Sequence, residues 1–224
     1  MTDQPIHIFH HIPKCGGTSV RYLLGQWFQI IEDYRKGWSM EYPEKVNLAA
    51  MQPHQCLCGH FELDGYHLYQ RYPEVFTSDR YRVFTFVRDP LQVRLSLFKY
   101  STSNGVPMHK SIEDALSDNT RFNFLARRFP VTMENYQSVL DKYFFIGIIE
   151  HGQDSMDILA AKLGKQPLPL PWENRTRQHT ERMLTKESLP QELIEKFKHD
   201  HALDYMIYDY CLDKFRKEMA NPTT

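Results

Sequence analysis

The stretch Ile6-His-Ile-Phe-His-His-Ile-Pro-Lys-Cys-Gly-Gly-Thr-Ser-Val-Arg-Tyr-Leu-Leu24 decides the fold of this chain. Its first part, residues 6–12, is rich in residues that favour β-strands, and residues 13–17 then break the pattern with a proline and two glycines. From Thr18 to Ile31, apolar residues recur at helical spacing. The stretch therefore predicts a strand, a glycine loop and a helix over 18–31.

The rest of the chain repeats this alternation of strand and helix. Short apolar segments at 56–61, 82–87 and 143–149 have the pattern of buried parallel strands. Periodic segments predict helices at 90–101, at 111–129 with a break near 118, and at 153–163, 186–197 and 201–216. These elements predict an α/β fold in which helices flank a mostly parallel sheet of at least four strands. The length of 224 residues without a polar linker predicts a single domain over residues 1–224.

Composition and charge limit the possible partners and location. The chain has 27 basic and 28 acidic residues, a formal net charge of −1, which argues against nucleic acid as a partner. Four cysteines are too few for a disulfide scaffold. There is no charged leader followed by a long apolar stretch, and no apolar run is long enough to span a bilayer. We therefore expect a cytoplasmic protein without a transmembrane segment.

The glycine loop has the chemistry of an anion-binding site. Where a strand gives way to a helix, the backbone N–H groups of Gly16, Gly17, Thr18 and Ser19 and the helix dipole favour a bound phosphate. Lys14 precedes the glycines, whereas a Walker A loop places its lysine after them, so the spacing argues against ATP bound with magnesium. The alternative is a tight turn capped by a threonine.

A second anion-binding candidate follows the strand at 82–87. Arg88 is expected at the carboxyl edge of the sheet, where open α/β sheets bind their ligands, and Ser96 lies eight residues later on the helix that Pro90 opens. A guanidinium and a hydroxyl placed in this way can hold one phosphate from two sides. The alternative is that Arg88 and Asp89 only cap the helix.

Two segments of the chain are Ile-Pro-Lys-Cys-Gly-Gly-Thr-Ser19 and Phe84-Thr-Phe-Val-Arg-Asp-Pro-Leu-Gln-Val-Arg-Leu-Ser-Leu-Phe-Lys-Tyr100. Together they resemble the paired nucleotide motifs of sulfotransferases that use 3′-phosphoadenosine-5′-phosphosulfate. The resemblance is to the branch of the carbohydrate and heparan uronyl 2-O-sulfotransferases. The resemblance implies a P-loop-like sheet and a donor site in which Arg88 and Ser96 hold the 3′-phosphate. It implies that the loop residues Lys14, Gly16, Gly17, Thr18 and Ser19 hold the 5′-phosphosulfate, and that Cys15 in the same loop also binds the cofactor. It covers roughly 6–24, 54–63, 81–101, 172–180 and 199–215.

The same resemblance implies catalytic residues. Lys14 would offset charge on the leaving oxygen, so the chemistry needs no metal. The segment Cys56-Leu-Cys-Gly-His60-Phe-Glu62 resembles the Gly-His segment whose histidine is the proposed base in the 2-O-sulfotransferases, and an imidazole suits proton removal from an alcohol. Glu62 is the alternative base, and His60 could instead be an ordinary strand-end residue. Because Cys56, Cys58 and His60 alternate along a strand, zinc is a further alternative, but their spacing differs from common zinc motifs.

A later segment, Trp172-Glu-Asn-Arg-Thr-Arg177, resembles the family loop that closes over the nucleotide, which implies that Arg175 and Thr176 bind the cofactor. A solvated charged loop is the alternative. The resemblance also implies a hydroxylated acceptor, a carbohydrate or a small metabolite. Arginines on one predicted helical region, at Arg121, Arg127 and Arg128, are candidates for recognising an acidic substrate. Two other functions stay open: a small-molecule kinase with an atypical loop, and a non-catalytic nucleotide-binding module.

Overall fold

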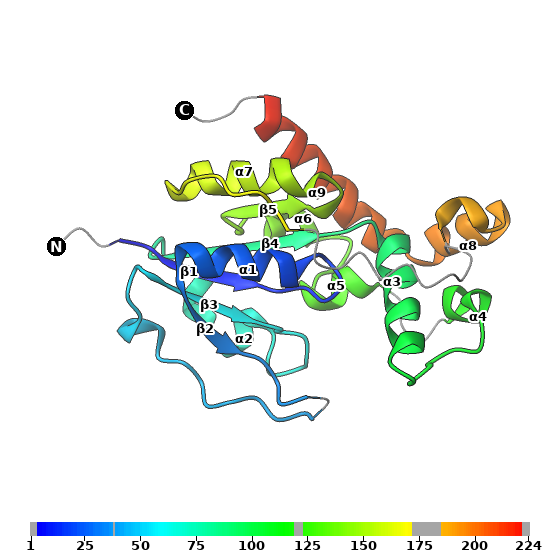
Figure 1. Cartoon of the computed structure of the whole chain (residues 1–224), viewed down its shortest axis with the longest axis horizontal. Coiled ribbons are helices and arrows are strands. Elements are labelled where there is room, and N and C mark those ends of the chain that lie inside the picture. The colour runs from blue at the N-terminus through cyan, green and yellow to red at the C-terminus, as the bar shows by residue number, and fades with distance from the viewer. Residues whose placement is uncertain (1–3, 38, 119–122, 172–184, 221–224) are drawn as a thin grey trace.

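The computed structural model describes residues 4–37, 39–118, 123–171 and 185–220. Within these ranges a five-stranded sheet forms the centre of the molecule, in the order β2-β3-β1-β4-β5 (Figure 1). Every pair of neighbouring strands is parallel. The strands are β1 (Ile6–His10), β2 (Gln29–Asp33), β3 (Gln55–Gly59), β4 (Tyr81–Val87) and β5 (Phe145–Ile148).

Helices follow the strands on both faces of the sheet (Figure 1). They are α1 (Gly17–Trp27), α2 (Leu68–Arg71), α3 (Pro90–Ser103), α4 (Ile112–Ser117), α5 (Phe124–Arg128), α6 (Tyr136–Leu140), α7 (Gly152–Leu163), α8 (Gln191–Asp200) and α9 (Ala202–Ala220). Short 3₁₀ turns occur at Leu48–Ala50, Pro73–Phe76, Ile149–His151 and Lys186–Ser188. This alternation confirms the α/β fold with a parallel, helix-flanked sheet that the sequence predicts.

Side chains alternate between two cores because successive residues of a strand point to opposite faces. Phe9 and Phe84 pack with α1 and α7 on one face. Ile8 and Val83 pack on the other face with residues of α2, α5, α6 and α9. Both faces are therefore covered, as a parallel sheet requires. A third, smaller cluster joins α3, α4 and α8 beside the sheet.

The predicted helix at 18–31 is wrong in its last part. Helix α1 ends at Trp27, Phe28 is extended, and Gln29–Asp33 form β2, which pairs with β3 in register from Gln29 opposite Gln55. Ile30 and Ile31 are β-branched and favour a strand, and pairing with β3 decides the local structure. The sheet therefore has a fifth strand, which the helical spacing of its apolar residues did not predict.

Other helix boundaries shift by smaller amounts. The predicted break in the segment 111–129 separates α4 from α5, and residues 119–122 lie outside the described part of the chain. The predicted helix at 186–197 becomes a 3₁₀ turn followed by α8, because Pro190 lacks the N–H that a continuous helix would use.

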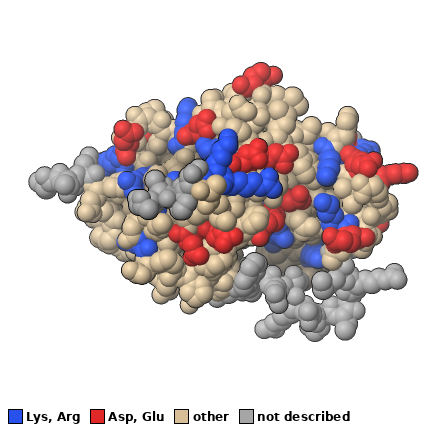
Figure 2. All heavy atoms as spheres, turned by 90° about the horizontal axis from the view of Figure 1, so that it is seen from above, with Lys and Arg blue, Asp and Glu red and all other residues tan. Residues whose placement is uncertain are grey.

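Acidic and basic side chains are interspersed on the face shown in Figure 2, consistent with a formal net charge of −1. Among the described residues, no helix combines the length and the apolar character needed to cross a membrane. The cytoplasmic location stays a prediction.

Candidate functional site

The candidate site lies at the carboxyl edge of the sheet, where ligands of open α/β proteins bind. Four adjacent strands, in the order β2, β3, β1 and β4, are followed directly by Tyr34, His60, His11 and Arg88. Because parallel strands end at the same edge, the fold brings together the glycine loop, the proposed base and the strand-end arginine. Tyr34 and His11 were not among the predicted site residues, and Tyr34 was hidden by the missed strand.

The loop between β1 and α1 is shaped by its two glycines. Gly16 adopts a φ of 76° as the N-cap of α1, and no described side chain caps this helix end. A Cβ added to Gly16 would lie 2.2 Å from Ile149 Cδ1, and one added to Gly17 would lie 1.9 Å from Nε2 of His11. Packing therefore requires glycine at both positions, and the first N–H groups of α1 are left for a ligand or solvent.

Lys14 belongs to the glycine loop and contacts Arg88 of the second predicted anion-binding site. Its backbone has a φ of 65°, and its carbonyl oxygen accepts a hydrogen bond from Arg88 Nη1 at 3.3 Å. Its Nζ lies 4.1 Å from the centre of the Tyr100 ring on α3. Burial and the nearby Arg88 lower the pKa of the Lys14 amine. Two cations therefore sit close together at the glycine loop, which favours an anion between them.

Helix α3 begins just after Arg88 and carries Ser96, and these two residues form the second predicted anion-binding site. Asp89 caps this helix by accepting a hydrogen bond from the Gln92 N–H at 2.9 Å, and Pro90 fills its first turn. Ser96 is half-buried, and Tyr100 lies one turn after it on the same helix face. Glu150, just after β5, accepts from the Asp89 N–H at 3.0 Å and from the Tyr208 hydroxyl at 3.2 Å. The start of α3, and with it Arg88, is thereby fixed.

Cys15 does not present its side chain to a ligand. It is 1% exposed and belongs to the core, and burial raises the pKa of its thiol to about 12. A thiol lowered in pKa by the helix end, and therefore reactive, would require exposure that this position lacks. Only the backbone of Cys15 is available to the loop, so its side chain is a small core residue.

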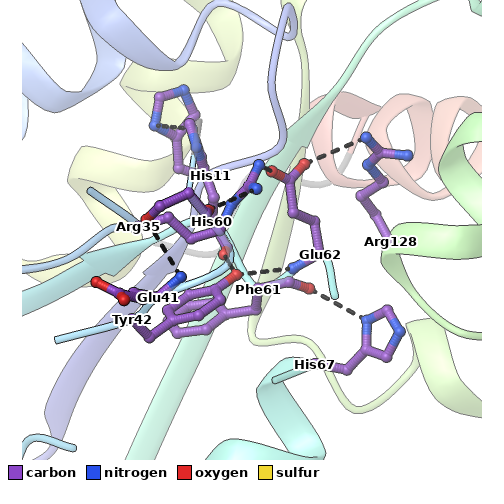
Figure 3. A network of polar contacts seen from close by, with 10 residues as sticks. His11, Arg35, Glu41, Tyr42, His60, Phe61, Glu62, His67 and Arg128 are labelled. Carbon is purple, nitrogen blue, oxygen red and sulfur yellow. Dashed lines mark hydrogen bonds and ion pairs between the residues drawn. The ribbon is translucent and has the colours of Figure 1, made fainter. Parts of the chain in front are cut away.

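His60 lies against the His11 ring (Figure 3) and against the Tyr34 ring, both at the strand ends. Its Nε2 is 3.2 Å from Nδ1 of His11, and the same His11 nitrogen is 3.0 Å from the Tyr34 hydroxyl. Burial lowers the pKa of His60 to about 4, with Arg35 and Arg128 contributing and Glu62 opposing. His60 is therefore neutral near pH 7, as a general base must be before it accepts a proton.

Glu62 is engaged by two arginines (Figure 3). Oε1 accepts from Arg35 Nη2 at 2.5 Å, and Oε2 accepts from Arg128 Nη2 at 3.2 Å. Both carboxylate oxygens thus have charged donors, which makes Glu62 a weaker candidate for the base. Tyr42 supports the same segment by donating from its hydroxyl to the His60 carbonyl oxygen.

Two of the three predicted acidic-substrate arginines, Arg127 and Arg128, lie in the described part of the chain. Arg128 is half-buried, pairs with Glu62 and stacks on Phe124, while Arg127 is exposed. Arg121 lies outside the described residues, as do Arg175 and Thr176. Arg128 is therefore part of the Glu62 ion-pair network.

Cys56 and Cys58 are fully buried on the face of the sheet that α1 covers. Their sulfur atoms lie 4.0 Å apart, and burial raises the pKa of the Cys56 thiol well above its usual value. Across the described ranges, no group of three or more His, Cys, Asp or Glu side chains is arranged to hold a metal ion. The thiols pack as core residues.

Comparisons with known proteins place the fold. No protein-family model matches the chain, and no curated protein matches it. Among solved structures, the chain is similar to a sulfotransferase from Alicyclobacillus acidocaldarius, with a TM-score of 0.56 and 14% sequence identity over 95% of this chain and 98% of the other. The chain therefore has a sulfotransferase-like α/β fold over nearly its full described length.

Proposed function

We propose that this protein transfers a sulfuryl group from 3′-phosphoadenosine-5′-phosphosulfate to a hydroxyl group of an acceptor. The observation that carries the proposal is the meeting of the glycine loop, Arg88 and His60 at adjacent strand ends of a sulfotransferase-like fold. These groups provide an anion cradle, a phosphate-binding guanidinium and a base. Neither Lys14 nor Arg88 has a carboxylate partner among the ion pairs of the described residues.

The donor would bind across the loop and the start of α3. The N–H groups at the start of α1 would accept the 5′-phosphosulfate, with Lys14 moving from the Tyr100 ring onto it. Arg88 and Ser96 would hold the 3′-phosphate. Burial and repulsion by Arg88 lower the pKa of Lys14, and an anion bound between the two side chains offsets both effects. Arg175 and Thr176 are proposed to complete this site.

The reaction is a single in-line displacement. The acceptor oxygen bonds to sulfur as the bond from sulfur to the 5′-phosphate oxygen breaks, and 3′,5′-bisphosphate leaves. Lys14 and the loop N–H groups stabilise charge on the leaving and sulfuryl oxygens. The proton of the acceptor hydroxyl passes to the free ring nitrogen of His60. Bound donor brings negative charge beside His60, which favours the imidazolium that forms.

We further propose a polar acceptor, a carbohydrate or a small hydroxylated metabolite. Besides His11 and Tyr34, the groups near His60 include Arg35, Glu62 and Tyr42, whose side chains all carry hydrogen-bonding atoms. Sugar hydroxyls can exchange hydrogen bonds with such a charged network, whereas an apolar acceptor would desolvate it without compensation.

Transfer of ³⁵S from labelled donor tests this function. The acceptors would include a uronic acid polysaccharide, neutral oligosaccharides and phenols, and release of labelled sulfate to water gives a readout that needs no acceptor. We expect label to leave the donor, with loss of this activity in Lys14→Ala and His60→Ala. His199→Ala is the matched control, because the His199 side chain is 90% exposed.

Two results would overturn the proposal. Tight bisphosphate binding with neither transfer nor donor hydrolysis would indicate a non-catalytic binding module. Transfer of ³²P from labelled ATP in magnesium would indicate a kinase.

A further inference from the structure

We propose that His11 is a positioning residue that holds His60 in one tautomer, with the proton on Nε2 and the lone pair on Nδ1. The observation is the approach of His60 Nε2 to His11 Nδ1 at 3.2 Å (Figure 3), together with the Tyr34 hydroxyl at 3.0 Å from the same His11 nitrogen. The catalytic meaning of this arrangement rests on the proposed function, in which His60 is the base.

His11 is fixed by its surroundings. Its backbone N–H donates to the Gly59 carbonyl oxygen at 3.0 Å, which extends the pairing of β1 with β3 to the residues at the site. Its ring stacks on Phe9, with centroids 5.4 Å apart and an interplanar angle of 9°. The opposite edge of the His11 ring packs so closely on Gly17 that a Cβ added to Gly17 would overlap the ring. The imidazole therefore has little freedom to turn.

The direction of the hydrogen bonds follows from Tyr34. Within the described part of the chain, the Tyr34 hydroxyl has His11 Nδ1 as its one hydrogen-bond partner, so its O–H is satisfied by donating to that nitrogen. His11 Nδ1 then acts as an acceptor, and His11 carries its own proton on Nε2. A second nitrogen facing the same lone pair must also be a donor. His60 Nε2 therefore carries hydrogen, and Nδ1 is its basic nitrogen.

In this arrangement His11 orients His60, as a third residue commonly orients a catalytic base. When Nδ1 of His60 takes the proton of the acceptor hydroxyl, the Nε2 hydrogen stays directed at His11, which stabilises the imidazolium. The sulfuryl group moves to the acceptor oxygen in the same step, and the bisphosphate leaves. His11 itself gains and loses no proton.

Nitrogen-15 NMR of the histidine rings near pH 7 tests the inference on the free protein. We expect the His60 signals of the parent protein to show hydrogen on Nε2 alone. His11→Leu removes the acceptor and should give His60 a mixture of both tautomers. His11→Asn has nearly the same shape as leucine but keeps an oxygen near the place of Nδ1, so it should restore the single tautomer.

His10→Leu is the matched control. His10 is the neighbouring buried histidine, its Nδ1 lies 2.9 Å from the Tyr143 hydroxyl, and it makes no hydrogen bond with His60. We expect its replacement to leave the His60 tautomer unchanged. The inference is wrong if His60 of the parent carries hydrogen on Nδ1, or if His11→Leu leaves its spectrum unchanged.

Kinetics separate this inference from the proposed function. Titration with 3′,5′-bisphosphate should give affinities within about 2-fold of the parent for His11→Asn and His11→Leu. Donor turnover should fall by about 10- to 100-fold in His11→Leu, a part of what a general base contributes, and recover in His11→Asn. If no variant, nor the parent, binds bisphosphate, the proposed function fails while the NMR result still decides the role of His11.

Discussion

Arg88 donates a hydrogen bond from Nη1 to the carbonyl oxygen of Lys14 over 3.3 Å and so joins the end of β4 to the glycine loop 74 residues earlier in the chain. The two predicted anion-binding groups are therefore one structural unit. A ligand that neutralises Arg88 also affects the backbone that carries Lys14. This contact is the basis of the first prediction.

Replacing Arg88 by alanine should weaken binding of 3′,5′-bisphosphate by about 10- to 100-fold, the range expected for lost hydrogen bonds to a charged group. Arg88→Lys should recover only part of this loss, because an ammonium cannot form the paired contacts of a guanidinium. Calorimetric titration measures both. Arg216→Ala is the control, since the side chain of Arg216 is 66% exposed on α9. Equal affinity for Arg88→Ala and parent protein would remove Arg88 from the donor site.

Gly17→Ala should destabilise the protein by about 1–3 kcal/mol, because the new methyl group would overlap the His11 ring. Adding His11→Ala removes the obstructing imidazole and should recover most of that loss. Urea unfolding of the two single variants and the double variant measures the coupling. Purely additive effects would show that Gly17 is required for another reason.

Asp204 on α9 holds the start of α5. Its Oδ1 accepts a hydrogen bond from the Ala126 N–H at 2.9 Å, and the side chain is 1% exposed. Asp204→Ala leaves buried N–H groups without this acceptor and should lower the free energy of unfolding by about 1–3 kcal/mol. Asp204→Asn, which retains an acceptor oxygen, should lose less. Asp213→Ala, at an exposed position of the same helix, should cost under about 0.5 kcal/mol in the same urea titrations. Equal losses for the variants at 204 and 213 would contradict the capping role.

The sequence predicts four of the five strands of the sheet. Strands β1, β3, β4 and β5 are each an apolar segment between polar boundaries, and this pattern is visible without tertiary contacts. Strand β2 follows α1 after one residue, Phe28, and its apolar residues continue the helical spacing. Only pairing with β3 distinguishes the two structures, and that contact comes from distant residues.

The same reason explains which site residues were missed. Lys14 and Arg88 follow predicted strands and His60 lies near the end of the strand predicted at 56–61, so their meeting at one edge follows from parallel topology. Tyr34 follows the strand that was not predicted. The ion pair of Arg128 with Glu62, 66 residues away, was not predicted because it depends on where α5 packs. Contacts of this kind carry no local pattern in the sequence.

Acid should destabilise the folded protein well before its carboxylates are titrated. Burial lowers the pKa of His7, His60 and His201 to about 4 and that of His10 to about 3, against 6.5 when exposed. Between pH 6.5 and 4 the unfolded chain therefore binds more protons, and stability falls as pH falls. Burial raises the pKa of Asp204 to about 6 and also raises those of Glu150 and Asp209, which opposes this trend, while the lowered pKa of His11 adds to it.

The measurement is the free energy of unfolding in urea at pH 7.5, 6.5, 5.5 and 4.5. We expect it to decrease over the last three values, and to decrease less steeply in His10→Leu than in the parent protein. Stability that is constant or rises between pH 6.5 and 4.5 would show that these histidines are not held neutral by the fold.

The most direct test of the central claim is calorimetric titration of the purified protein with 3′,5′-bisphosphate, in parallel with ADP plus magnesium. The account predicts selective binding of the bisphosphate with micromolar affinity, lost in Arg88→Ala and kept in Arg216→Ala. Binding of ADP with magnesium alone, with no heat from the bisphosphate, would contradict the assignment of the glycine loop and Arg88 to a phosphosulfate donor.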